Sequence, residues 1–210
     1  TELILPDAAG ILDNSSFADC SALTSIKLPA YIDNIPSYAF QNCTALTSIV
    51  IPDKVNSINI NAFEGCTALK SVTFSNEINT ISNNAFYGCT ALENVELPSK
   101  LLTLGEYSFY NCTSLKTITL PQSLGEIGQY AFKGCTQLTA VKLPSVLMNI
   151  RGGTFENCEN LAAAELPVGL LTIENYAFQN CMALKTVTIP SGVRTISQGA
   201  FSNCGLQEGR

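Results

Sequence analysis

A period of 23 residues runs along the chain and decides what it can fold into. Each of the nine cysteines follows the previous one by 23 positions, and a phenylalanine stands three residues before every cysteine. No insertion or deletion breaks this register between Phe17 and Cys204. A repeat this short cannot bury a core by itself, so consecutive repeats must stack and share one. The sequence therefore predicts a solenoid.

Each repeat contains one short stretch with the alternation of a strand. In the coil that begins at Leu46, the inward residues Ile49 and Ile51 alternate with outward ones, which is the two-residue period of a strand with one buried face. A proline follows this stretch in eight of the nine repeats, and Ser75 stands there in the other. Because proline cannot donate to a strand ladder, it ends the strand.

The rest of each repeat is compact. A second apolar pair, Val55 and Ile58, follows the proline, and the spacing of Ala62, Phe63 and Cys66 predicts a single tight helical or 3₁₀ turn. The residue directly before each cysteine is always Asp, Asn or Gly, the types that accept a left-handed backbone. We expect this residue to end the turn with a positive φ.

The motifs C-T-A-L-T-S-I-V-I-P (43–52) and I-N-I-N-A-F-E-G-C (58–66) recur along the chain and resemble the BspA-like (Treponema-type) leucine-rich repeat of bacterial surface proteins. The resemblance implies one right-handed solenoid of about nine coils, with parallel strands on a concave face and short helical turns opposite. The asparagine that many leucine-rich repeats place eight residues after the first leucine is absent here, as at Lys54. We therefore expect the cysteine and left-handed positions to define the turns.

Composition excludes several classes of function. The net charge of −6 and the pI near 4.6 disfavour nucleic acid and anionic lipid as partners, because both require clustered Lys and Arg. The chain has no histidine, so Ser–His and Cys–His nucleophile pairs cannot form within it. No apolar run is long enough for a membrane helix, and no glycine-rich phosphate loop occurs. We expect no catalytic residues, no cofactor and no integral membrane segment.

The cysteines admit three interpretations: disulfides between coils, a metal site, or a ladder of buried thiols. Equivalent side chains in a ladder point the same way, and the count is odd, both of which disfavour disulfides. Zinc sites need closely spaced cysteine pairs or histidines. The favoured interpretation is a column of buried structural thiols without metal. Its members are Cys20, Cys43, Cys66, Cys89, Cys112, Cys135, Cys158, Cys181 and Cys204.

The outward side chains of the predicted strands form the first candidate binding face. They are small, β-branched and nearly uncharged, and Thr and Val are also simply good strand formers. The candidate ligand-binding residues are Ser25, Lys27, Ser48, Val50, Ser71, Thr73, Asn94, Glu96, Thr117, Thr119, Lys142, Glu165 and Thr188.

A column of tyrosines two residues before the phenylalanine forms the alternative site. Tyr38, Tyr107, Tyr130 and Tyr176 share this position beside the predicted turn. The column either packs along the stack with its hydroxyls in water or binds a sugar or peptide.

Coil seven departs from the rest of the repeat. Ala162 to Ala164 replace larger residues, and Ala164 takes an inward position that is Ile or Val elsewhere. We expect weaker packing there, because less apolar surface is buried.

By resemblance, the leading hypothesis is a non-catalytic module on a secreted or surface-exposed bacterial protein. It would bind host matrix or cell-surface protein, or other cells, through the concave strand face. The alternatives are a rigid spacer that presents another domain, and glycan binding along the tyrosine column. We expect residues 1–210 to form a single leucine-rich-repeat domain of a longer protein, because neither end carries a polar capping repeat.

Overall fold

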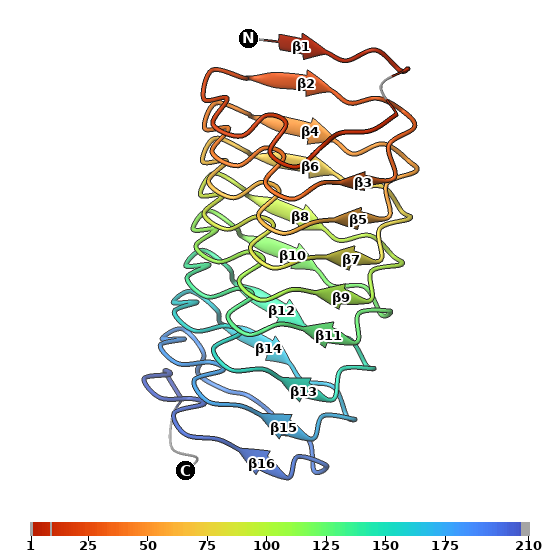
Figure 1. The fold of residues 1–210 in the computed structure, drawn as a ribbon. Coiled ribbons are helices and arrows are strands. Elements are labelled where there is room, and N and C mark those ends of the chain that lie inside the picture. The colour runs from red at the N-terminus through yellow and green to blue at the C-terminus, as the bar shows by residue number, and fades with distance from the viewer. Residues whose placement is uncertain (1, 9, 207–210) are drawn as a thin grey trace.

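The computed structural model describes residues 2–8 and 10–206, and these form one stack of coils with one repeat per coil (Figure 1). Two columns of short parallel strands run along the stack, and tight turns fill its remaining side. The predicted solenoid is confirmed, with about eight turns, since each column contains eight strands among the described residues. The expected ninth coil is not completed, because residues 185–191 form no strand.

The first column, here called the long-strand face, contains three-residue strands. Equivalent residues of neighbouring coils pair in parallel, as Ile49 pairs with Val72. In β4 the central Ile49 is buried and the residues on either side of it are exposed, which confirms the predicted alternation. The strands are β1 (Glu2–Ile4), β2 (Ser25–Lys27), β4 (Ser48–Val50), β6 (Ser71–Thr73), β8 (Asn94–Glu96), β10 (Thr117–Thr119), β12 (Ala140–Lys142) and β14 (Ala163–Glu165).

The second column contains two-residue strands that the sequence analysis does not identify. In most of these strands one residue is buried, as Ile58 is, and the other is partly covered, whereas Glu126 of β11 and both residues of β16 are exposed. Two residues are too few to show an alternation, so the pattern reveals only an apolar pair. The strands are β3 (Asn34–Ile35), β5 (Ser57–Ile58), β7 (Thr80–Ile81), β9 (Thr103–Leu104), β11 (Glu126–Ile127), β13 (Asn149–Ile150), β15 (Thr172–Ile173) and β16 (Thr195–Ile196).

The predicted helical or 3₁₀ turns are wrong, because the described part of the chain contains turns there and no helix. Along each turn, alternate backbone N–H groups donate to the next coil and to the same coil. In one coil those of Tyr38, Phe40 and Asn42 donate to carbonyls of the next coil at 2.7–3.0 Å. Those of Ala39, Gln41 and Cys43 donate three residues back within the same coil at 3.1–3.3 Å. Only half of the donors are therefore available for helix formation.

Left-handed residues interrupt each turn twice. The predicted position before each cysteine is confirmed in all nine repeats, with φ between 55° and 76°, as at Asn111 and Gly134. Some of its side chains also form an amide ladder, such as Asn180 Nδ2 to Asn157 Oδ1 at 2.7 Å. A second left-handed column lies four residues earlier and was not predicted. It contains Ser15, Tyr38, Asn61, Asn84, Tyr107, Tyr130, Gly153, Tyr176 and Gly199.

The phenylalanines and cysteines form the core of the stack. The nine phenylalanine rings stack from Phe17 to Phe201 with centroids 5.1–5.7 Å apart. Each thiol from Cys43 onward donates to the carbonyl of a phenylalanine in the preceding coil, as Cys112 Sγ does to Phe86 O at 3.3 Å. The cysteines are all free, so the expectation of buried thiols is confirmed for the seven from Cys43 to Cys181, while Cys20 is exposed and Cys204 half-buried.

Burial makes the inner thiols poor nucleophiles. It raises the pKa of Cys43 to about 11 and that of Cys135 to about 12. Burial also raises the pKa of Cys112 and Cys158 well above the ordinary thiol value. Since the thiolate is the reactive form, these positions are inert in the folded protein.

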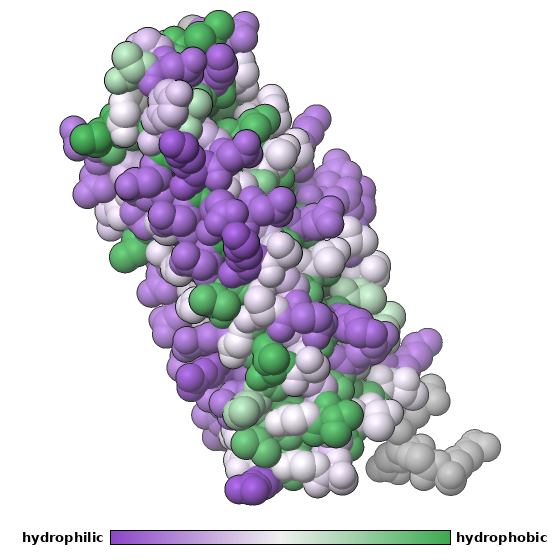
Figure 2. All heavy atoms as spheres, turned by 90° about the vertical axis from the view of Figure 1, so that its right-hand side faces the viewer, coloured by the Kyte–Doolittle hydropathy of each residue, from purple (hydrophilic) through white to green (hydrophobic). Residues whose placement is uncertain are grey.

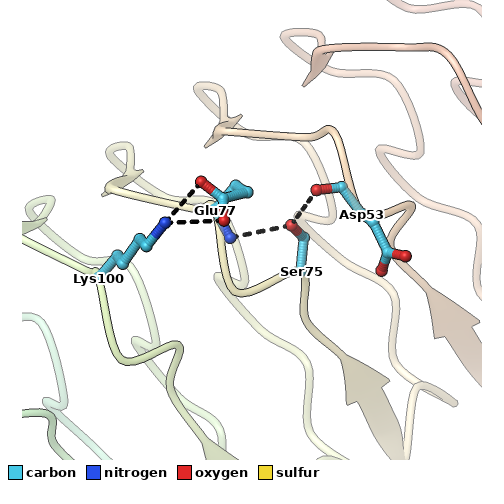
Figure 3. A network of polar contacts seen from close by, with 4 residues as sticks. All are labelled: Asp53, Ser75, Glu77 and Lys100. Atoms are coloured by element: carbon cyan, nitrogen blue, oxygen red, sulfur yellow. Dashed lines mark hydrogen bonds and ion pairs between the residues drawn. The ribbon is translucent and has the colours of Figure 1, made fainter.

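After β4, β8, β10, β12 and β14 the carbonyl of the proline that ends the strand closes the turn, as Pro52 O accepts from Val55 N–H at 3.0 Å. Ser75 replaces this proline and is 2% exposed. Its hydroxyl donates to Asp53 O at 2.9 Å and accepts from Glu77 N–H at 3.1 Å (Figure 3). Lys100 Nζ then contacts both carboxylate oxygens of Glu77 at 2.8 Å. Side-chain hydrogen bonds thus fix the turn that lacks proline.

The stack opens at its C-terminal end, between β14 and the coil that follows. A hollow of about 500 Å³ lies there, lined by 162–166, Val168, 186–188 and Pro190. Ala164 is only half-buried, whereas its counterpart Val141 is buried. The expected loose packing at coil seven is found where the short Ala164 side chain meets a following segment, 186–188, that forms no strand.

We predict that thiol labelling distinguishes these environments. At pH 8 the native protein should react rapidly at Cys20 and slowly at Cys204, while the seven buried thiols stay unmodified because their pKa is raised. All nine should react in denaturant without reductant. Mass spectrometry after quenching counts the labels, and fewer than nine labels on the unfolded chain would contradict the free-thiol assignment.

We predict that Tyr38→Asn raises the free energy of unfolding by about 0.5–1 kcal/mol, because asparagine tolerates the left-handed backbone better than tyrosine. Asn61 and Asn84 already occupy this column with φ of 57° and 56°. Urea denaturation followed by circular dichroism measures the change. A loss of stability would show that the Tyr38 ring contributes more than its backbone strain costs.

We predict that Ala164→Val stabilises the C-terminal coils by about 1 kcal/mol, because the added methyl groups fill part of the hollow. Ala163→Val is the matched control, since this side chain is exposed on the same strand. Thermal unfolding compares the two variants. Equal melting temperatures would mean that the hollow is not an under-packed part of the core.

Candidate functional site

The long-strand face presents the predicted candidate residues in two outward rows. Among the described strands of this face, each outward candidate is exposed except Ser25, which is half-buried. Thr188 is exposed but does not belong to a strand, because its segment does not pair with β14. The other candidates therefore lie on one face, whereas Thr188 lines the hollow instead of belonging to a strand of that face.

Part of the charge of this face is neutralised within it. Lys142 Nζ lies 2.9 Å from Glu165 Oε2, and both side chains are well exposed. Glu96 lines a shallow depression of about 440 Å³ together with Thr73 and Phe74. A partner of this face consequently meets small polar and methyl groups rather than a strong field.

Two carboxylates of coil seven, Glu156 and Glu165, form ion pairs with lysines of the preceding coil. Glu156 Oε1 lies 2.9 Å from Lys133 Nζ, and the Glu165 pair with Lys142 has the same length. Within residues 2–8 and 10–206, no group of three or more Cys, Asp or Glu side chains is arranged to hold a metal ion. The Glu156 pair is largely covered and helps to hold neighbouring coils together, whereas the Glu165 pair is exposed to solvent.

The tyrosine column is only partly continuous. The rings of Tyr107 and Tyr130 stack with centroids 5.0 Å apart, and Tyr110 joins them at 5.7 Å from Tyr107. Lys133 Nζ lies 5.3 Å from the centre of the Tyr130 ring. Tyr176 lies two coils further along, because Gly153 occupies the position between. The structure thus brings Tyr107 and Tyr130 together and leaves Tyr38 and Tyr176 in separate parts of the column.

An apolar patch that the sequence analysis misses lies on the edge where each long strand turns toward the next short strand. Figure 2 shows this edge, with hydrophilic side chains over much of its upper part and apolar ones gathered toward its C-terminal part. Exposed apolar side chains on these turns include Leu102, Val146, Met148 and Val168. Val168 is 89% exposed and also lines the hollow. Leu102 and Met148 share one repeat position, but polar residues or glycine occupy most of that column, so the repeat pattern does not reveal the patch.

None of the structural elements in the described residues is a helix long and apolar enough to cross a membrane.

A sequence profile described as the BspA type leucine rich repeat region matches residues 1–115 and 79–207, in six copies. The crystal structure of a T. pallidum leucine-rich repeat protein is 29% identical and superposes with a TM-score of 0.67, covering 86% of this chain and 76% of that one. Comparison with curated protein sequences finds no significant relative.

Two further bacterial structures share the fold. One is a leucine rich cell surface protein from Faecalibacterium prausnitzii, with 21% identity, a TM-score of 0.58, and coverage of 96% of this chain and 78% of that one. The other is the pneumococcal vaccine antigen PcpA, with 23% identity, a TM-score of 0.63, and coverage of 93% of this chain and 58% of that one. The profile spans nearly all of the sequence and the solenoid agrees with it, so the chain belongs to the BspA-type leucine-rich repeat family.

Proposed function

We propose that this chain is a non-catalytic recognition module that binds a protein of the host matrix or of a cell surface. It acts as a single repeat domain within a secreted or surface-exposed bacterial protein. Family membership supports a repeat-based interaction module, and the names of two structural neighbours, a cell surface protein and a vaccine antigen, favour exposure outside the cell. Fold alone does not fix the partner, so the surface must supply the argument.

The observation that carries the proposal is the continuity between the long-strand face and the apolar edge. The hollow contains Thr186 and Thr188 at one wall and Val168 at another, so it joins the two surfaces. Protein interfaces bind mainly through a desolvated apolar centre surrounded by polar contacts. The strand face alone offers no such centre, whereas the adjoining Val168 and Met148 do.

The polar residues of the same surface then orient the bound partner and add little to the binding free energy. The Lys142–Glu165 pair is solvated, with side-chain exposures of 73% and 69%, and exposed pairs of this kind contribute little energy. We therefore expect binding that depends weakly on salt and strongly on apolar contact.

The test measures binding of the purified chain to an immobilised panel of extracellular-matrix proteins by biolayer interferometry. We expect saturable binding to at least one of them, and we expect Val168→Glu to weaken it by about tenfold or more, because a charge is then buried in the interface. Charge reversal at Lys27, Glu96, Lys142 and Glu165 should weaken it less, by roughly two- to fivefold.

Ile11→Glu is the matched control, because Ile11 is similarly exposed, at 81%, and lies between β1 and β2 rather than near β14. It should bind as the unchanged chain does. Absence of saturable binding, or equal effects of the Val168 and Ile11 variants, would overturn the proposal. The first of these results would favour the rigid-spacer alternative.

A further inference from the structure

We propose that a notch on the turn side, between Tyr130 and Tyr176, binds one ring of a neutral saccharide. This site is separate from the long-strand face and does not depend on the function proposed for that face. The notch has a volume of about 260 Å³ and is lined by Gln129, Tyr130, Glu174, Asn175, Tyr176 and Ser197, with Gly152 beside them.

A glycine creates the gap. Tyr130, Gly153 and Tyr176 occupy the same left-handed column in three consecutive coils. Since Gly153 has no side chain, the Tyr130 ring leans into its place, and a Cβ at Gly153 would lie 2.3 Å from two ring carbons. The Tyr176 ring leans in the same way over Gly199, where a Cβ would lie 2.7 Å from it. The two tyrosines therefore flank the notch instead of stacking on each other.

Both tyrosines are held in a backbone conformation that does not suit them. Their φ values are 57° and 60°, in a region that favours Gly and Asn and costs a bulky side chain free energy. The same column contains Asn61, Asn84 and Gly199, so relaxed residues are accepted by this fold. Tyr38 and Tyr107 have the same backbone conformation outside the notch, so the strain belongs to the column, and the gap at Gly153 is what sets Tyr130 and Tyr176 apart.

Hydrogen bonds fix the orientation of one polar side chain of the notch, and two others have free hydrogen-bonding groups. Glu174 Oε2 accepts from Gly152 N–H at 2.9 Å, and Glu174 Oε1 lies 3.3 Å from Arg151 Nη1. These contacts fix the carboxylate and neutralise it, and they leave acceptor positions free for hydroxyl donors. Gln129 and Asn175 are exposed, and their amides make no side-chain hydrogen bond to other described residues.

This combination identifies the class of ligand. Aromatic faces suit the C–H surface of a sugar ring, while amide groups and a fixed carboxylate suit its hydroxyls. The carboxylate disfavours an anionic ligand, and its pairing with Arg151 removes the attraction for a cation. The volume is below the range of about 300–1,000 Å³ typical of drug-sized ligands, which limits the occupant to about one ring.

The test uses methyl glycosides of glucose, galactose, mannose and N-acetylglucosamine, with sialic acid as an anionic comparison. Saturation-transfer NMR on the purified chain detects binding at millimolar affinity, which is the strength expected of so small a ligand. We expect transfer to at least one neutral glycoside and none to sialic acid.

Tyr176→Asn should weaken this binding by about tenfold or more while the chain stays folded, because asparagine fits the left-handed position. Gly153→Asn is a second variant, whose side chain should displace the Tyr130 ring and close the notch. Tyr38→Asn is the matched control, since Tyr38 has the same backbone conformation but lies outside the notch. Circular dichroism verifies the fold of each variant.

Four results would overturn the site. These are no transfer from any neutral glycoside at 50 mM or below (a ceiling of roughly ten times the ~5 mM limit of useful affinity), equal binding by Tyr176→Asn, an equal loss in Tyr38→Asn, or stronger transfer to sialic acid than to the neutral sugars. Val168→Glu should leave sugar binding unchanged, so failure at the notch and failure at the long-strand face are distinguishable.

Discussion

The carbonyl of each core phenylalanine is the point at which neighbouring coils are joined. Phe86 O accepts from Cys89 N–H of its own coil at 3.2 Å and from Cys112 Sγ of the next coil at 3.3 Å. Both lone pairs of a buried oxygen are thereby satisfied, which avoids the cost of leaving it unpaired. The ring of the same residue stacks on the ring of the next coil. An insertion between the phenylalanine and the cysteine of a coil would disturb all three contacts at once, and this explains why the spacing of these two residues is constant.

The ion pairs follow the same geometry. Lys100 with Glu77, Lys116 with Glu93, and Lys133 with Glu156 each join residues that are 23 positions apart. Equivalent positions of successive coils lie side by side, so opposite charges at these positions meet across the stack. Several basic residues of this acidic chain are thus engaged between neighbouring coils.

Features that one residue type, or one class of residues, marks at a fixed repeat position could be predicted from the sequence, and features without such a mark could not. The buried cysteine column, the long strands and the left-handed residue before each cysteine depend on one residue type at one position. The second left-handed column contains Tyr38 and Tyr107, and tyrosine gives no indication of a positive φ. The helical turns were predicted from the spacing of Ala62, Phe63 and Cys66, which cannot reveal that alternate N–H groups donate to the next coil.

The candidate surfaces divide in the same way. The outward rows of the long-strand face follow from the alternation of the strands, and the three alanines of coil seven correctly predict loose packing. The apolar edge escapes prediction because Val146, Met148 and Val168 occupy turn positions that are polar elsewhere, as at Asp53 and Lys54. A stack of equivalent coils produces a uniform surface, and a specific ligand needs a site that is not uniform. The places where the repeat is broken, at Ala164 and at Gly153, are therefore the places where this solenoid acquires a hollow and a notch.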